Sequence, residues 1–207
     1  MIAIIDYGMG NLRSVQKALE SLSQEAVITD DPAVLERATH VILPGVGAFG
    51  DAMARLEETG LDKVVKQLAA NGKPLLGICL GMQLLFESST EGGYHEGLGL
   101  IPSQIVRFPA DMGLKVPHMG WNNLAPCEGS VLYEGTGESP YVYFVHSYYA
   151  AEVSDEWTAA TCTYGVTYTA AVQRGNVFGT QYHPEKSSAA GLQMLRNFIE
   201  YKGDAAC

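Results

Sequence analysis

The sequence predicts an α/β fold, with a doubly wound, mostly parallel sheet, flanking helices and added antiparallel strands. Three observations support this prediction. Before residue 80, short apolar runs alternate with segments in which apolar residues recur at helical spacing. The runs are nearly continuous, which is typical of parallel strands buried on both faces. From about residue 104 onward, short stretches rich in Tyr, Val and Thr indicate antiparallel strands.

The first strand and helix follow from the first 22 residues. Residues 1–6 (MIAIID) predict a buried strand, and the glycine-containing segment 7–10 predicts a turn. Asn11 is a favourable N-cap for the next helix. The apolar residues expected on one face of that helix are Leu12, Val15, Leu19 and Leu22. Together these segments form one βα unit.

The same pattern recurs up to the strand at residues 75–78. The expected elements are a strand at 25–29, a short helix around Val34, a strand at 40–43, a loop at 44–50, helical turns carrying Phe49, Met53 and Leu56, and a helix carrying Leu61, Val64, Val65 and Leu68. Asn71 and Gly72 end the last of these helices. Strands separated by helices pair in parallel through right-handed crossovers, which predicts the doubly wound sheet.

The second half of the chain predicts strands and a closing helix. We expect antiparallel strands at 105–108, 141–145, 158–162, 170–174 and 177–182. A last helix, capped by Ser187 or Ser188, places its apolar face against the body of the protein. That face consists of Leu192, Leu195, Phe198 and Ile199. We expect the tail at 202–207 to fray.

Length and charge limit the class of protein. The chain has 207 residues and a formal net charge of -10. We expect one domain over residues 1–207, because no composition break, repeat or low-complexity tract divides it. No apolar run reaches the roughly 18 residues that cross a membrane, and the apolar start ends at Asp6 without a basic flank. The acidic balance argues against nucleic acid, since phosphate binding requires clustered Lys and Arg.

Cysteine and glycine spacing predicts neither a metal nor a cofactor. The cysteines are Cys79, Cys127, Cys162 and Cys207. Their separation disfavours a zinc knuckle, a CxxC motif and a dense disulfide framework, which fits a reducing cytoplasm. Gly8 and Gly10 resemble the start of a phosphate-binding loop, but position 13 is Arg and no Walker sequence occurs. We interpret both glycines as turn formers.

Cys79 stands where a predicted strand turns into a helix. Gly77 and Gly81 flank it at two residues on either side, which is the G-x-nucleophile-x-G layout. Such a turn lifts the side chain above the sheet, and N–H groups at a helix start favour the thiolate. A cysteine taken alone is more often a small core residue, but the flanking glycines favour a nucleophile. Cys127, Cys162 and Cys207 lack this frame.

His183 is the candidate base among five histidines. It lies in the segment GTQYHPE (residues 179–185), at the end of a predicted strand. If the chain stays extended across Pro184, His183 and Glu185 share one face, so the carboxylate can orient the imidazole. A surface histidine near a turn is the ordinary reading of HPE alone. The predicted strand-to-helix turn at Cys79, a nucleophile elbow, makes a Cys–His–Glu triad the favoured interpretation.

The expected chemistry also requires donors for a developing oxyanion. The Leu80 N–H qualifies because it follows the nucleophile. A second donor is expected from the loop PGVG (residues 44–47), whose glycines permit the necessary peptide orientation. On the loop sequence alone, an ordinary βα turn is equally compatible.

These motifs together resemble the class I glutamine amidotransferases. The match covers GICLG (residues 77–81), the following Met82 and Gln83, and G-x-Q-x-H-P-E. The resemblance implies L-glutamine as the substrate and hydrolysis through a Cys79 thioester. It places the second oxyanion donor at Val46 or Gly47. It further implies that glutamine is held by Gln83, by Glu91 and by backbone groups of Ser147 and Tyr148.

Within that family, the chain resembles the stand-alone glutaminases that serve a cyclase in histidine biosynthesis. The markers are residues 5–12 (IDYGMGNL), 43–49 (LPGVGAF), 117–122 (PHMGWN) and 143–149 (YFVHSYY). One glutaminase-sized domain occupies the whole chain, so we expect the ammonia acceptor on a separate (β/α)8-barrel cyclase. The resemblance implies an interface at Asn11, Trp121 and Lys186. A helix cap, a core position and a surface charge are their respective structural alternatives.

Three other functions are open at this point. The glutaminase subunit of pyridoxal phosphate synthase has a similar length, but its loop is expected to be richer in glycine and followed by Glu-Ser. A cysteine peptidase or hydrolase of the same topology would not need Gln83 or the HPE sequence. An inactive binding module would be expected to lack part of the triad.

We also expect the 45–47 peptides to point away from the oxyanion until the partner is loaded, which would keep hydrolysis slow.

Overall fold

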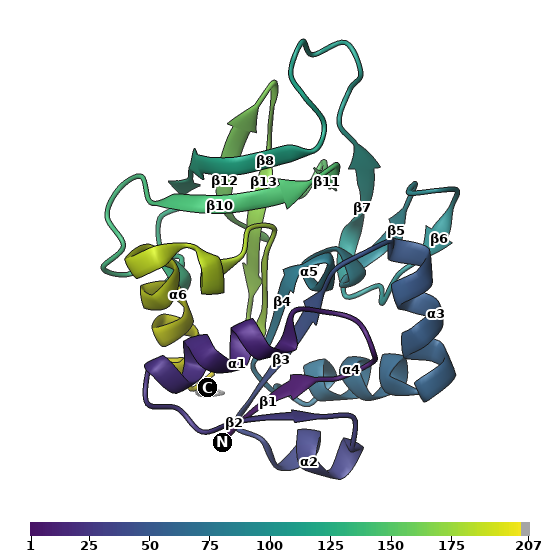
Figure 1. The fold of residues 1–207 in the computed structure, drawn as a ribbon, viewed down its shortest axis with the longest axis vertical. Coiled ribbons are helices and arrows are strands. Elements are labelled where there is room, and N and C mark those ends of the chain that lie inside the picture. The colour runs from purple at the N-terminus through teal and green to yellow at the C-terminus, as the bar shows by residue number, and fades with distance from the viewer. Residues whose placement is uncertain (204–207) are drawn as a thin grey trace.

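The computed structural model describes residues 1–203 of the chain (Figure 1). Its helices are α1 (Leu12–Ser21), α2 (Pro32–Arg37), α3 (Phe49–Thr59), α4 (Leu61–Ala70), α5 (Leu80–Leu84) and α6 (Ser188–Glu200), with short 3-10 turns η1 (Val131–Tyr133) and η2 (Pro184–Lys186). The strands before residue 100 are β1 (Ile2–Ile5), β2 (Ala26–Thr29), β3 (His40–Gly45), β4 (Leu75–Cys79), β5 (Phe86–Ser89) and β6 (His95–Glu96). The later strands are β7 (Ile101–Arg107), β8 (His118–Asn123), β9 (Ala125–Pro126), β10 (Tyr141–His146), β11 (Tyr148–Ala151), β12 (Thr158–Tyr164), β13 (Val166–Arg174) and β14 (Val177–Thr180).

The main sheet has a parallel half and a mixed half. In the described part of the chain it contains twelve strands, and its main path runs β2-β1-β3-β4-β14-β13-β11-β7-β5-β6. The first five strands of this path are parallel to one another. Antiparallel pairs then join β14 to β13, β13 to β11 and β11 to β7. The doubly wound, mostly parallel core that the sequence predicts is therefore confirmed.

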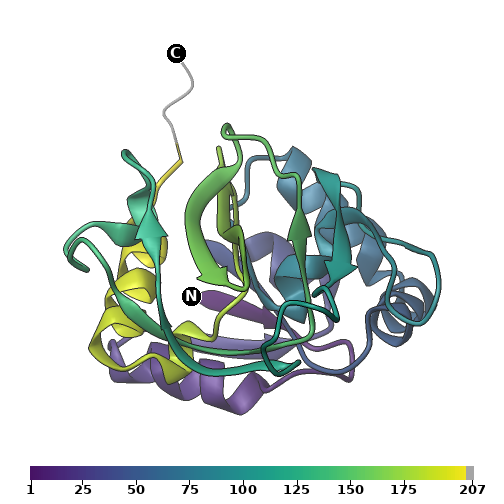
Figure 2. The same cartoon turned by 90° about the horizontal axis from the view of Figure 1, so that it is seen from above.

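Helices cover both faces of the parallel half. Ala3 and Ile5 pack in a core cluster with apolar residues of α2, α3 and α4. Ile2 and Ile4 point the other way and pack with residues of α1 and α6. Alternate residues of one strand thus enter two cores, which explains why the strand is apolar throughout. Figure 2 shows α1 and α6 on one side of the sheet and α3 and α4 on the other.

The segment at 177–182 corrects one prediction. We expected an antiparallel addition, but β14 lies between β4 and β13 and is parallel to β4. All four of its residues are buried, as in a central strand. The strand ends at Thr180, two residues earlier than predicted. Its carboxyl end therefore lies at the same edge of the sheet as the end of β4.

The segment at 141–145 corrects another. It forms β10, which within residues 1–203 pairs with β8 alone, in a separate two-stranded antiparallel ribbon rather than in the main sheet. The sequence analysis did not predict β8. Along β10 buried residues alternate with more exposed ones, so only one face of the ribbon packs on the body. The strands predicted at 105–108, 158–162 and 170–174 are present, and each extends farther toward its N-terminus or C-terminus.

Two predicted helix caps differ in detail. Asn11 and Ser187 occupy the N-cap positions of α1 and α6, but neither side chain makes a capping hydrogen bond. The Ser187 hydroxyl donates instead to the His183 carbonyl and accepts from the Tyr143 N–H at 3.0 Å. Ser187 therefore stabilises the turn that follows β14. The part of the predicted tail at 204–207 lies outside the described residues.

A search for membrane-crossing helices among the described residues finds none with the required length and apolar character.

Candidate active site

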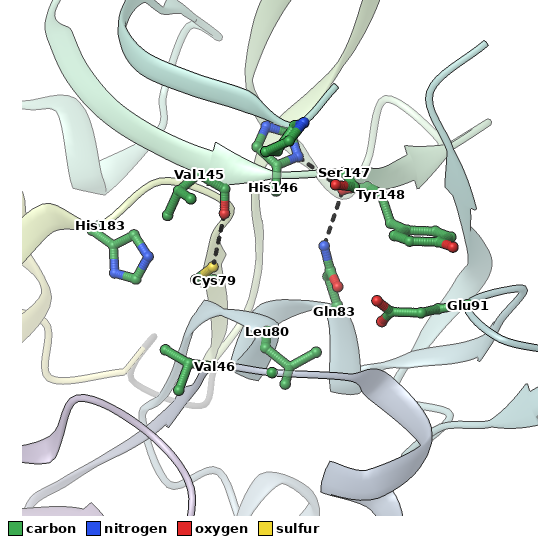
Figure 3. A pocket seen from close by; sticks show the side chains of 12 residues that line it. Val46, Cys79, Leu80, Gln83, Glu91, Val145, His146, Ser147, Tyr148 and His183 are labelled. Carbon is green, nitrogen blue, oxygen red and sulfur yellow. Dashed lines mark hydrogen bonds between the residues drawn. The ribbon is translucent and has the colours of Figure 1, made fainter. Parts of the chain in front are cut away.

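A pocket of about 390 Å³ lies where β3, β4 and β14 end. This is the edge of a parallel sheet at which α/β proteins bind ligands. The lining residues are Val46, Gly47, Cys79, Leu80, Gln83, Glu91, Pro117, Val145, His146, Ser147, Tyr148 and His183. Figure 3 shows Cys79 between His183 on one side and Gln83 and Glu91 on the other. The volume is within the range of small-molecule sites.

Cys79 has the backbone conformation of a nucleophile elbow. It is the last residue of β4 and the N-cap of α5, with φ 56° and ψ -113°. A non-glycine residue at positive φ is strained, and such strain is retained where the surrounding packing enforces it. The side chain is directed into the pocket, and the residue is 7% exposed.

The flanking glycines allow this turn because the chain passes close to its neighbours. A Cβ at Gly81 would collide with the Leu43 carbonyl oxygen of β3. A Cβ at Gly77 would lie 2.6 Å from the Gly81 carbonyl oxygen. Both obstacles are backbone atoms, which cannot swing aside. The G-x-C-x-G spacing is therefore a packing requirement of the elbow.

The surroundings of the sulfur differ from the sequence expectation in one respect. The sequence predicted a helix after Cys79, and this helix has only five residues, so its dipole is weak. The Sγ lies 3.9 Å from the Val145 carbonyl oxygen and 4.0 Å from the Gln181 Nε2. The backbone N–H groups of the first turn still start at Leu80, directly beside the sulfur.

His183 and Glu185 form a buried pair. The imidazole Nδ1 lies 2.8 Å from the Glu185 Oε1, and the two side chains are 3% and 1% exposed. Since Glu185 is an acceptor when ionised, the pair places the proton on Nδ1. Among the described residues the buried His183 Nε2 has no hydrogen-bond partner. This nitrogen belongs to a ring that lines the same pocket as Cys79.

The pKa of His183 reflects its charged neighbours. Burial by itself lowers the pKa of this imidazole, but interactions with the Cys79 and Glu185 side chains outweigh burial and raise the pKa to about 9. Among the described residues Nε2 has no partner at full hydrogen-bond geometry, yet the ring is close enough to Cys79 for that side chain to raise its pKa. A cationic imidazole beside a cysteine is the state that favours thiolate.

The loop after β3 is held at its upstream end. The Tyr7 hydroxyl donates to the Pro44 carbonyl oxygen at 3.0 Å. Burial, followed by the charge of Cys79, raises the pKa of Tyr7 well above its usual value, so the hydroxyl stays protonated. Beyond this bond, Val46 is 42% exposed and Gly47 adopts φ 98°, a conformation that favours glycine. Both residues line the pocket.

Gln83 is fixed by two hydrogen bonds. Its Nε2 donates to the Tyr148 carbonyl oxygen at 3.0 Å and to the Gln181 Oε1 at 2.9 Å. Sequence reasoning did not identify Gln181, although it is fully buried and its own amide lies beside the sulfur. Gln181 and His183 are two residues apart in the bend that follows β14. That short spacing in the sequence is the signal that could have found Gln181.

A buried histidine pair supports the Tyr148 carbonyl. The His146 Nδ1 lies 2.8 Å from that oxygen, so it must donate. The His146 Nε2 lies 3.1 Å from the His118 Nδ1, and the Asn122 amide lies 3.3 Å from the His118 Nε2. Burial lowers the pKa of His146 to about 3 and that of His118 to about 4, so both rings are neutral at physiological pH. The sequence analysis assigned neither histidine a role.

The remaining sequence candidates lie around the same pocket. Glu91 lines it, and its Oε2 also accepts a hydrogen bond from the Phe49 N–H at 2.9 Å. Ser147, which links β10 to β11, and Tyr148, the first residue of β11, line the opposite wall. The structure therefore gathers every candidate for substrate binding, although these segments are far apart in the sequence.

The three candidates for a partner interface are outside the pocket. Trp121 is 42% exposed on β8, Lys186 is exposed in η2, and Asn11 is half-buried before α1. Trp121 pairs in register with Tyr143, whose carbonyl accepts from the His183 N–H at 3.0 Å. Lys186 is three residues beyond His183. The segments of Trp121 and Lys186 thus adjoin a part of the candidate active site.

The other cysteines are remote from the pocket. Cys127 is exposed and Cys162 is buried, and both are free. Burial raises the pKa of the Cys162 thiol to about 11, which disfavours the reactive thiolate. Cys207 lies outside the described residues.

Comparison with known proteins identifies relatives along nearly the whole chain. The model of the family described as Glutamine amidotransferase class-I matches residues 3–201. "Imidazole glycerol phosphate synthase subunit HisH" of Moorella thermoacetica is 53% identical over 199 residues, covering 96% of this chain and 94% of the relative. The subunit of the same name from Methanothermobacter thermautotrophicus is 53% identical over 200 residues, covering 97% and 98%.

Solved structures show the same fold at lower identity. "Crystal structure of glutamine amidotransferase" matches with a TM-score of 0.76 and 22% identity, covering 97% of this chain and 98% of the other. "Structure of PurLQS from Thermotoga maritima" matches with a TM-score of 0.75 and 22% identity, covering 97% of each chain. At this identity the likeness speaks for the fold and not for the substrate.

Proposed function

Since this chain belongs to the glutamine amidotransferase class-I family, we propose that it is the glutaminase subunit of an imidazole glycerol phosphate synthase. It hydrolyses L-glutamine to glutamate and ammonia and passes the ammonia to a cyclase subunit in histidine biosynthesis. One domain carries this activity. The observation that carries the proposal is 53% identity to subunits of that name over nearly the full length of both chains.

Cys79 is the nucleophile of the proposed reaction. Its thiolate attacks the side-chain amide carbon of glutamine, and the carbonyl oxygen becomes an oxyanion. The Leu80 N–H, together with a peptide N–H at Val46 or Gly47, stabilises that charge. Removing one such donor typically costs about 3 kcal/mol of transition-state stabilisation. The pocket supports this assignment, because the elbow and the loop line the same cavity.

His183 manages the protons. As an imidazolium it donates the Nε2 proton to the leaving nitrogen, so ammonia departs and a Cys79 thioester forms. The neutral ring then takes a proton from water as the water attacks the thioester. Glutamate leaves and the thiolate and imidazolium are restored. Glu185 orients the ring through Nδ1 throughout, at the distance of 2.8 Å found in the pair.

Three segments hold the substrate in the proposed complex. Gln83 is kept in place by the Tyr148 carbonyl and by Gln181, so its amide is oriented before glutamine arrives. The Ser147 and Tyr148 backbone binds the glutamine from the opposite wall. Glu91 contributes a negative charge for the α-ammonium group. Oriented polar groups on a rigid frame reduce the entropy that is lost on binding.

The cyclase docks on the face formed by Asn11, Trp121 and Lys186. Trp121 and Lys186 each adjoin the segment that carries His183, which supports this choice of face. Ammonia must pass between the subunits without meeting bulk water, because water converts most of it to ammonium, which is not a nucleophile. We further propose that the complex works in the cytoplasm, where free thiols such as Cys79 and Cys162 remain reduced.

Partner-dependent hydrolysis tests this proposal. The protein alone, with its loop at 45–47 in the resting orientation, is expected to hydrolyse glutamine slowly. Addition of the cyclase and its phosphoribulosyl nucleotide substrate should raise glutamate formation at least about 10-fold, and cyclase product should form in equal amount. Glutamate release that is equally fast with and without the partner would contradict the claim that the partner controls the orientation of the 45–47 loop. Absence of cyclase product would contradict the assigned function.

A further inference from the structure

Glu91 reaches the start of a helix that lies 42 residues earlier in the chain. Its Oε2 accepts from the Phe49 N–H, the first amide of α3. The N-cap position of α3 is Ala48, which makes no side-chain hydrogen bond to the helix. A helix start leaves such amides unpaired, and a carboxylate is the acceptor that its dipole favours. Glu91 therefore supplies the cap that the helix sequence lacks.

This cap lies immediately downstream of the oxyanion loop. The loop is fixed upstream by the bond between Tyr7 and Pro44. Among the described residues, the Phe49 N–H is the next backbone group along the chain that forms a hydrogen bond with a side chain from another segment. Only residues 45–48 lie between these two points, and they include Val46 and Gly47, the candidate donors. Two side chains from distant segments thus set both ends of the loop.

Glu91 is itself held by the edge of the sheet. Its N–H donates to the Ser89 Oγ at 3.2 Å, and Ser89 is fully buried. Ser89 is the last residue of β5 and pairs in parallel with Ile105 of β7. The carboxylate is therefore presented from a fixed strand end rather than from a free loop.

The same carboxylate faces the cavity. Glu91 lines the pocket, and Figure 3 shows its oxygens directed toward Gln83. A carboxylate offers about four lone-pair sites, and the Phe49 N–H uses one of them. The group can thus hold the helix and accept a ligand ammonium at the same time.

We propose that Glu91 is a positioning residue for the oxyanion loop, which it holds through the Phe49 amide while it binds the substrate. This inference rests on the proposed glutaminase function. Its consequence is that glutamine occupancy and loop position are linked through one side chain. A residue that only binds the α-ammonium would affect KM, whereas a residue that also sets the loop affects kcat.

Two substitutions separate these roles. Glu91→Gln removes the charge that attracts ammonium but keeps an oxygen for the Phe49 N–H. Glu91→Ala removes both. Glu87, an exposed residue of β5 outside this pocket, provides the matched controls Glu87→Gln and Glu87→Ala. Glutamine hydrolysis is measured with the cyclase and its nucleotide present, so that every variant is compared in the complete complex.

We expect both Glu91 variants to raise the KM for glutamine about 10-fold or more, because a charged hydrogen bond is lost. The kcat of Glu91→Gln should stay within about 3-fold of wild type, whereas that of Glu91→Ala should fall roughly 10- to 100-fold, as expected for a displaced catalytic group. The Glu87 variants should match wild type. Equal kcat values for the two Glu91 variants would overturn the positioning role.

Hydrogen exchange at the Phe49 amide tests the bond without any substrate. In Glu91→Ala this amide should exchange at least about 10-fold faster, and Glu91→Gln should show partial protection. Unchanged exchange in Glu91→Ala would overturn the inference whatever the kinetics. A wild-type complex that releases no glutamate contradicts the proposed function, whereas an active complex with equal variants contradicts only the role of Glu91.

Discussion

At the scale of single residues, the chemistry depends on the charge that Glu185 and Cys79 impose on His183. The imidazole would lose proton affinity through burial, yet its pKa is raised to about 9. A raised pKa means that the cationic ring persists below that value and is lost as the pH rises through it. The general acid for the leaving nitrogen is therefore available across the physiological range.

Glu185→Gln is expected to lower the pKa of His183, because the substitution removes one of the two interactions that raise it. The alkaline limb of kcat/KM for glutamine should move to lower pH, and kcat should fall roughly 100- to 10,000-fold. Rates measured from about pH 6 to about pH 10 check this shift. Glu128→Gln, at an exposed position, is the control. An unchanged alkaline limb in Glu185→Gln would show that Glu185 does not set the charge of His183.

The sequence was sufficient to locate residues that sit in local motifs. Cys79 and its glycines lie two residues apart, as do His183 and Glu185, so short motifs identify them. The predicted pair of His183 and Glu185 forms, but across a 3-10 turn at Pro184–Lys186 and not across an extended chain. Gln181 was missed because its partner Gln83 is 98 residues away. The Glu91 bond to Phe49 was missed for the same reason, since it joins segments 42 residues apart. Contacts between distant segments leave little trace in the spacing of residues.

At the scale of elements, the elbow is set by how closely β3, β4 and α5 approach. Gly81 touches the backbone of β3, and Gly45 of β3 lies against the Gly81 N–H and the Tyr7 hydroxyl. A Cβ built at Gly45 would lie 2.8 Å from each of those atoms. The two glycines face each other across adjacent strand ends. Close backbone approach at this point brings the oxyanion loop to the nucleophile.

Gly81→Ala should therefore destabilise the protein, because its Cβ would meet the rigid Leu43 carbonyl. We expect a loss of about 3 kcal/mol or more in the free energy of unfolding, measured by urea titration. Gly72→Ala is the control, since Gly72 has φ 76° but open space around it. It should lose only about 1–2 kcal/mol, from the left-handed backbone. Equal losses in the two variants would mean that contact with Leu43 is unimportant.

Element order was predictable to the end of β4 and less so beyond it. Up to that strand, helices alternate with strands that pair in parallel with one another, so hydrophobic period and turn residues suffice to identify the elements. After it, β14 enters the parallel core from the far end of the chain, and β8 pairs with β10 in a separate ribbon. These pairings are chosen by tertiary packing. A short strand sequence carries too little information to specify its partner.

At the scale of the whole molecule, buried histidines whose pKa values are shifted in opposite directions shape the pH dependence of stability. Burial lowers the pKa of His118 and His146 below the ordinary value of 6.5, so the unfolded chain binds protons more readily as the pH falls. His183 has the opposite effect on the pH dependence of stability, because its pKa is raised in the folded protein. Its stabilisation is fully present below about 6.5 and is lost as the pH rises through 9.

The melting temperature is accordingly expected to be highest near about pH 6.5 and to fall on both sides. Calorimetry between about pH 4 and about pH 9 measures this profile. His183→Asn should flatten the alkaline side while leaving the acid side, to which His40, His118 and His146 contribute through their lowered pKa values. A melting temperature that climbs steadily from pH 6.5 to 9 in the wild-type protein would contradict this assignment of charges.

The proposed glutaminase activity depends on Cys79 being the group that reacts with a glutamine side chain. Incubation with a glutamine-like diazo ketone, followed by peptide mapping in the mass spectrometer, tests this most directly. We predict one adduct, on Cys79, and no adduct in Cys79→Ala. An adduct on Cys127 or Cys162, or undiminished labelling of Cys79→Ala, would contradict the account.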